Sequence, residues 1–164
     1  MKKCCFKILC VCVITAALAV SGCSDAPVAE EENVRAIETA VRVYDDALVR
    51  AFAGLDMNEL SAAATQAQAD KEFALMAALG EGRMRMLATL LSLEFGEATF
   101  PEEGSANITT TEVWDYDHVS LDTSETVRVE RDVVYRLQYE LILKDGRWLV
   151  DSVTSVADSP QPSE

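Results

Sequence analysis

Hydrophobic residues in the first half of the chain recur every three or four positions, which is the period of an amphipathic helix. This spacing predicts a helix from Asn33 to about Gly54, whose inward positions are Val34, Ile37, Val41, Tyr44, Leu48, Phe52 and Leu55. A second helix is predicted to begin with a cap at Asp56 or Asn58 and to end near Gly80. Its expected inward residues are Leu60, Ala64, Ala67, Phe73, Met76 and Leu79.

Beyond residue 90 the hydrophobic period changes from three or four residues to two, which indicates strands. Strands are predicted within residues 91–95, 107–121, 126–143 and 148–156. Asp145-Gly146 fits a two-residue hairpin turn, because both central residues of that turn need positive φ. The order of elements predicts an α+β fold with two helices packed on one face of an antiparallel sheet of about four strands. Strands of this length should make the sheet curl around the helices.

The N-terminus has the three parts of a secretory signal: Met1-Lys2-Lys3, an apolar run to Val20, and small residues before Cys23. Val20-Ser21-Gly22-Cys23 resembles the bacterial lipobox, which implies acyl chains on Cys23 that anchor the protein to a membrane. Two alternatives are an uncleaved transmembrane anchor over residues 4–20 and an ordinary signal that leaves the Cys23 thiol free. The expected location is the bacterial cell envelope. In a Gram-negative cell this would be the outer membrane, facing the periplasm, and otherwise the outer face of the cell membrane.

Four segments follow from these patterns. Residues 1–22 are predicted to be a lipoprotein signal peptide and residues 23–32 a lipidated tether, because the latter are polar and lack periodicity. Residues 33–156 form the predicted α+β domain. Residues 157–164 have the composition of a disordered tail.

Composition excludes several classes of partner and site. The 164-residue chain has 28 acidic and 14 basic residues, and three of the basic residues precede Cys23, so cleavage there leaves a net charge of −17. Such acidity argues against nucleic acid as a partner, because phosphate binding needs clustered Lys and Arg. After cleavage one histidine and one cysteine remain, so we expect no metal centre of the zinc or multi-histidine type, no internal disulfide and no cofactor.

The most suggestive chemistry lies in Trp114-Asp115-Tyr116-Asp117-His118. On a strand Trp114, Tyr116 and His118 share one face, and the two aspartates share the other. We interpret His118 as a surface residue at the strand end. The alternative places it in a cavity as an acid or base, where only the cross-strand residues Glu130 or Asp132 supply a carboxylate.

The remaining charged residues on the predicted strands have simpler interpretations. Asp115, Asp117 and Asp122 do not match a calcium loop. We interpret them as a solvated acidic face. The arginines of the long strand and the hairpin are expected to pair with acids across strands. They are Arg128, Arg131, Arg136 and Arg147.

Three segments of the second half together resemble a known superfamily. They are Thr111–Tyr116, Tyr135–Leu141 and Asp145–Val150. These resemble the C-terminal half of NTF2-like (nuclear transport factor 2-like) domains, and in particular the IMS domain of the plastid-division ARC-six family. The resemblance implies a cone with a curved sheet enclosing a pocket beneath the helices, and members often pair through the open sheet face. It transfers no catalytic residue to this chain.

These observations predict a non-enzymatic, membrane-anchored envelope lipoprotein that binds a protein partner or a small apolar ligand, with a homodimer through the sheet as a further possibility. The expected pocket residues are Trp114, Tyr116, His118, Tyr135 and Tyr139. The alternative is a small dehydratase, isomerase or hydrolase that uses His118. No residue is predicted to be catalytic in the favoured interpretation.

Overall fold

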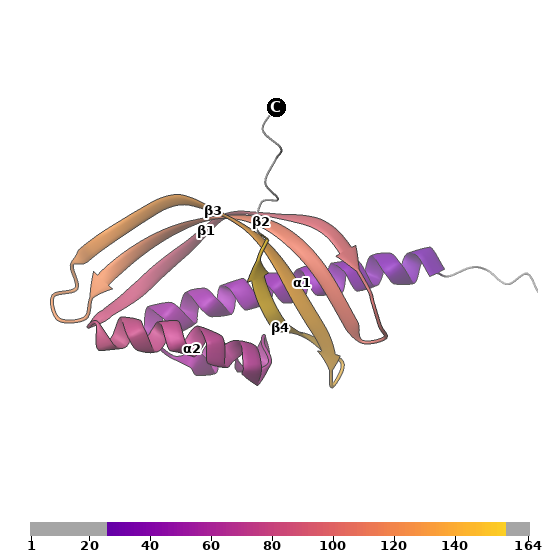
Figure 1. The fold of residues 1–164 in the computed structure, drawn as a ribbon, viewed down its shortest axis with the longest axis horizontal. Coiled ribbons are helices and arrows are strands. Elements are labelled where there is room, and N and C mark those ends of the chain that lie inside the picture. Colours follow the sequence, from indigo (N-terminus) through magenta and orange to yellow (C-terminus); the bar gives the residue numbers. More distant parts are fainter. Residues whose placement is uncertain (1–25, 157–164) are drawn as a thin grey trace, which may run out of the picture.

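The computed structural model describes residues 26–156, and it consists of helices followed by one sheet (Figure 1). The helical elements are α1 (Ala26–Gly54), the short 3₁₀ helix η1 (Met57–Ala62) and α2 (Gln66–Glu81). The strands are β1 (Met84–Thr99), β2 (Ser105–Ser120), β3 (Thr126–Lys144) and β4 (Arg147–Ser155). The predicted α+β order of two helices and a four-stranded antiparallel sheet is confirmed.

The sheet is an antiparallel meander in the order β1-β2-β3-β4, and it arches over α1 and α2, which lie beneath its concave face (Figure 1). Asp145 and Gly146 both have positive φ, as a two-residue hairpin turn requires. β4 is short and pairs only with Leu137–Lys144 of β3. Within the described residues, the first half of β3 therefore has a paired strand on one side only.

The core forms between α1 and the concave face of the sheet. Ile37, Val41 and Tyr44 of α1 are fully buried, as are Ile108 on β2 and Tyr139 on β3. Burial of side chains of this size supplies roughly 1.5–3 kcal/mol each. The apolar stripe predicted for the first helix is thus the face that packs on the sheet.

The helices differ from prediction at their ends and in two inward residues. α1 begins at Ala26, so residues 26–32, expected to be tether, are helical. Pro27 is compatible with this because a helix's first turn needs no backbone N–H donor. The predicted second helix is divided into η1, capped by Asp56, and α2, capped by Thr65. Phe73, expected inward, is 50% exposed, and Ala67, also expected inward, is exposed too, because α2 turns its Gln68 and Met76 face to the core.

β3 contains a bulge that changes the direction of its side chains. Trp114 pairs with Val133 but Tyr116 pairs with Glu130, so two residues of β3, Arg131 and Asp132, lie opposite the single residue Asp115 of β2. One of them, Asp132, has φ 52°, and its N–H donates to Asp115 Oδ1 at 2.9 Å. The bulge keeps Glu130 on the concave face, opposite Tyr116.

The predicted signal peptide, Cys23 and the predicted tail lie outside the described residues. Within residues 26–156, neither α1 nor α2 combines the length and the apolar character that crossing a membrane requires.

Candidate functional site

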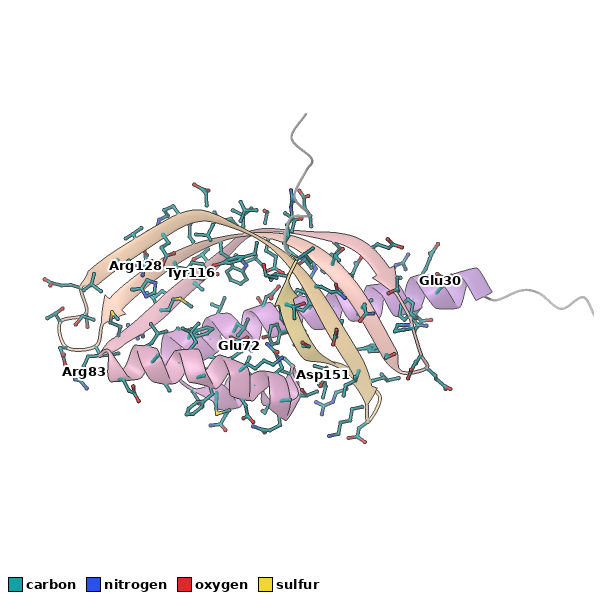
Figure 2. The ribbon with its side chains drawn as sticks, in the orientation of Figure 1. Glu30, Glu72, Arg83, Tyr116, Arg128 and Asp151 are labelled. Atoms are coloured by element: carbon teal, nitrogen blue, oxygen red, sulfur yellow. The ribbon has the colours of Figure 1, made fainter. Side chains whose placement is uncertain are left out.

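A half-open pocket of about 200 Å³ lies between the helices and the concave face of the sheet. Its walls come from α1, α2 and all four strands. The apolar lining residues are Leu48, Phe52, Leu75, Met86, Ala88, Leu137 and Val153. The polar and aromatic ones are Tyr44, Asp45, Glu72, Glu112, Trp114, Tyr116, Tyr135 and Tyr139. Tyr116 on the sheet and Glu72 on α2 mark the two sides of this pocket, the sheet side and the helix side (Figure 2).

Aromatic rings form much of the wall contributed by the sheet. Trp114 and Tyr116 are stacked, with ring centroids 6.1 Å apart and planes at 9°. Tyr135 meets Tyr116 edge-on at 6.5 Å. Alternation along β2 and β3 brings these rings to the concave face, so the pocket offers a rigid aromatic surface to a ligand.

A buried polar cluster forms the end of the pocket nearest α1. Glu112 accepts hydrogen bonds from Thr110 Oγ1 at 2.7 Å and from Trp114 Nε1 at 2.8 Å. Tyr139 Oη lies 2.8 Å from Glu112 Oε1 and 3.2 Å from Asp45 Oδ1. One hydroxyl has one proton, so Tyr139 donates to only one of the two carboxyl groups at a time.

Asp45 is the least satisfied member of this cluster. It is 1% exposed, and its Oδ2 is the buried side-chain atom without a hydrogen-bond partner among the described residues. Burial, with a smaller contribution from Glu112, raises the pKa of Asp45 to about 8. Asp45 therefore holds a proton at neutral pH, which it can donate to Tyr139 Oη while Tyr139 donates to Glu112.

A second polar group lies where α2 crosses the pocket. Tyr44 Oη donates to Glu72 Oε1 at 3.0 Å, and Gln68 Nε2 lies 2.8 Å from both of these atoms. Burial raises the pKa of the Glu72 carboxyl above its usual range. Gln68 Oε1 accepts the N–H of Val153, so α1, α2 and β4 are joined at this point.

Four of the five pocket residues expected from the sequence line this pocket: Trp114, Tyr116, Tyr135 and Tyr139. Their role in binding stays a prediction. His118 is not among the lining residues. Its side chain is only 13% exposed, whereas the sequence interpretation placed it on the surface. Its Nε2 lies 3.1 Å from Glu130 Oε1, which also pairs with Arg128 at 3.2 Å.

The acidic face predicted for β2 is paired with an arginine of β3. Arg131 contacts Asp117 at 2.5 Å and Asp115 at 3.6 Å across the strands. This confirms the expected cross-strand pairing for Arg131. Arg128 differs, because its partner Glu130 is on its own strand. Asp122 pairs instead with Arg83, at the end of α2.

Asp45, Glu72 and Glu112 were not predicted from the sequence as pocket residues. Two of these carried a usable signal. Asp45 is four residues after Val41 and so lies beside the buried stripe of α1, and Glu112 precedes Trp114 by two and so shares its face. The signal for Glu72 was ambiguous: it precedes Met76 by four residues and so shares its helix face, but the neighbouring Phe73 was expected inward instead.

A scan against protein-family models finds no match, and no match is found among curated proteins. Solved structures do match. The intermembrane-space region of the chloroplast protein ARC6 is 17% identical with a TM-score of 0.67, over 76% of this chain and 96% of that one. A ketosteroid isomerase-like protein from Erwinia carotovora atroseptica is 16% identical with a TM-score of 0.50, over 77% and 98%. A periplasmic fragment of TraM is 12% identical with a TM-score of 0.52, over 72% and 96%.

These likenesses establish the fold. The described domain has the cone-shaped α+β fold of these proteins, which is the NTF2-like fold that the sequence resemblance implied. At such identities they carry no activity across, and the neighbours include both an isomerase-like protein and proteins whose names describe no reaction.

Proposed function

We propose that the domain is a non-enzymatic binding module that takes one small, largely apolar molecule with a single polar group into its pocket. The observation that carries this proposal is the pocket itself, where aromatic and aliphatic walls converge with a few buried polar groups. Its volume of about 200 Å³ is somewhat larger than a cavity of roughly 150 Å³ that binds benzene. The expected ligand is therefore one aromatic ring with a short substituent.

Filling the pocket tests this proposal. Ala88 lines the pocket from β1, whereas Thr89, the next residue, is exposed. Ala88→Phe should lower the affinity for 2-phenylethanol at least tenfold by occupying the site, and Thr89→Phe should leave it unchanged. Ligand-detected NMR measures binding, and circular dichroism checks that both variants fold. Equal binding by the two variants would place any ligand site elsewhere.

The enzymatic alternative uses His118 with a cross-strand carboxylate. Glu130 supplies that carboxylate. The pair is nevertheless a weaker candidate for catalysis, because His118 is not among the residues that line the pocket and Glu130 is also held by Arg128. We therefore favour binding over catalysis.

We further propose that a lipid on Cys23 holds the domain at the envelope membrane. The lipobox-like sequence supports this, and two neighbours in the fold comparison are named as envelope-side regions. Cys23→Ala should leave the precursor unprocessed, visible as a larger band by electrophoresis. Normal maturation of that variant would contradict the proposal.

A protein partner, including a second copy of this chain, is the alternative occupant of the domain's surface. The outer face of the sheet carries exposed apolar residues, with Val129 at 51% and Val134 at 59% exposed. Sedimentation velocity tests the homodimer: a dimer that Val134→Lys converts to monomer would support it, and a monomeric wild type would exclude it over the concentrations used.

A further inference from the structure

We propose that the pocket selects a small organic cation, a protonated amine carried on a hydrophobic ring, and that Asp45 is the carboxylate that pairs with it. This inference rests on the proposed function, because it names the ligand class of the same pocket.

The ionisable side chains that line the pocket, apart from its tyrosines, are all carboxyl groups. Asp45, Glu72 and Glu112 line it, and no Lys, Arg or His appears among the described lining residues. Carboxyl groups in a concave site of low dielectric focus a negative field, which attracts cations and disfavours anions. The overall acidity of the chain does not produce this arrangement, since several of its surface acids are paired with arginines such as Arg83 and Arg131.

The aromatic walls add a second attraction for a cation. The faces of tryptophan and tyrosine rings carry partial negative charge and stabilise an ammonium group within about 6 Å of the ring centroid. Trp114, Tyr116 and Tyr135 stand together on one wall, in contact with one another. A neutral ligand would gain contact area from these rings, and a protonated amine would gain the electrostatic attraction as well.

Asp45 provides the specific partner. Its Oδ2 is buried, has no hydrogen-bond partner and belongs to a residue of the pocket lining. A buried carboxyl group must be neutralised by a proton or paired with a cation. In the empty pocket the proton does this, consistent with the raised pKa of about 8, and a bound ammonium group would take its place. The titratable and charged groups around Asp45 are Arg42, Tyr44 and Asp46 on α1, Glu112 on β2 and Tyr139 on β3, with Glu72 of α2 in the same pocket.

The exchange of a proton for a ligand has a measurable consequence. Binding of an amine at pH 7 should release close to one proton from Asp45, and at pH 9 it should release little, because Asp45 is then mostly ionised already. The affinity for the amine should therefore rise about tenfold from pH 7 to pH 9. A neutral ligand should show neither effect.

Isothermal titration calorimetry on the full chain, purified in a neutral detergent with detergent alone as blank, tests the proposal. The probes are 2-phenylethylamine, its neutral counterpart 2-phenylethanol, and phenylacetate as the anion. Titrations at pH 7 in two buffers of different ionisation enthalpy measure the proton release. At pH 9 the amine should bind about tenfold more tightly than the alcohol, and phenylacetate should bind least.

Two variants with the same change of charge separate the pocket from the surface. Asp45→Asn should abolish the preference for the amine, and Asp46→Asn, on the neighbouring exposed residue, should keep it. Equal affinities for amine and alcohol in the wild type would overturn the cation inference and leave the proposed function standing. Absence of binding by all three probes would overturn the proposed function and the inference with it. The proton release is measured on the unmodified protein, so the test does not depend on the folding of a variant.

Discussion

Replacing Asp45 by Asn should change how folding stability depends on pH. In the folded protein Asp45 is 1% exposed and its pKa is raised from 3.8 to about 8, first by burial and then by Glu112. In the unfolded chain the same carboxyl group is solvated and has its ordinary pKa. Between these two values the unfolded state has released a proton that the folded state retains, so the free energy of unfolding falls as pH rises.

The size of the effect follows from the shift. Below pH 3.8 both states are protonated and Asp45 adds no pH dependence. Each unit of pKa difference corresponds to about 1.36 kcal/mol. A difference of roughly four units therefore lowers the free energy of unfolding by at most about 6 kcal/mol, and this limit is approached near pH 8. From pH 5 upward roughly three units remain, or about 4 kcal/mol. Asn cannot ionise, and its amide can still donate to Tyr139 Oη. The free energy of unfolding of Asp45→Asn should therefore not show this fall as pH rises.

Urea unfolding followed by tryptophan fluorescence at pH 5, 7 and 9 measures the prediction. The variant and the wild type should have similar stability at pH 5, and the variant should be more stable by several kcal/mol at pH 9. Asp46→Asn is the control, since it removes the same charge from an exposed position. Parallel pH dependences for wild type and Asp45→Asn would show that Asp45 does not titrate with a raised pKa.

Three further substitutions have expected outcomes in the same urea assay. Ile108→Ala removes a fully buried side chain of β2 and should cost about 2–5 kcal/mol; a cost below about 1 kcal/mol would mean that the α1–sheet core is packed differently. Thr65→Ala removes the cap of α2, whose hydroxyl accepts the N–H of Gln68 at 3.4 Å, and should cost about 0.5–1 kcal/mol, with Thr65→Ser retaining stability. Arg131→Ala breaks two half-exposed ion pairs and should cost less than about 1 kcal/mol, so a larger loss would assign the bulge a structural role.

The sheet could be predicted from the sequence because its determinants are local. Alternation along residues 107–121 and 126–143 fixes which side chains share a face, and Asp145-Gly146 fixes the last hairpin. The same rule placed Trp114 and Tyr116 together in the pocket. These features need no knowledge of distant contacts.

The polar cluster and the helix ends depend on contacts that are distant in sequence or on weak local signals. Asp45 contacts Tyr139, which is 94 residues away in the sequence. The raised pKa of Asp45 could therefore not be predicted from the sequence of α1 alone. The bulge at Asp132 depends on a hydrogen bond to Asp115, 17 residues earlier. The start of α1 was misplaced for another reason: residues 26–32 have no apolar stripe, and a helix can extend past its buried face.

Among the described residues, the short β4 leaves residues 126–135 of β3 without a partner strand on one side. A strand edge of this kind is a template for pairing with another chain, which leads to aggregation. Charged residues and the bulge interrupt this edge: Arg128, Glu130, Arg131 and Asp132 all fall within it. A straight incoming strand would have to bury these charges and follow the break in the hydrogen-bonding register. The bulge that directs Glu130 inward therefore also protects the protein from edge-to-edge association with other strands.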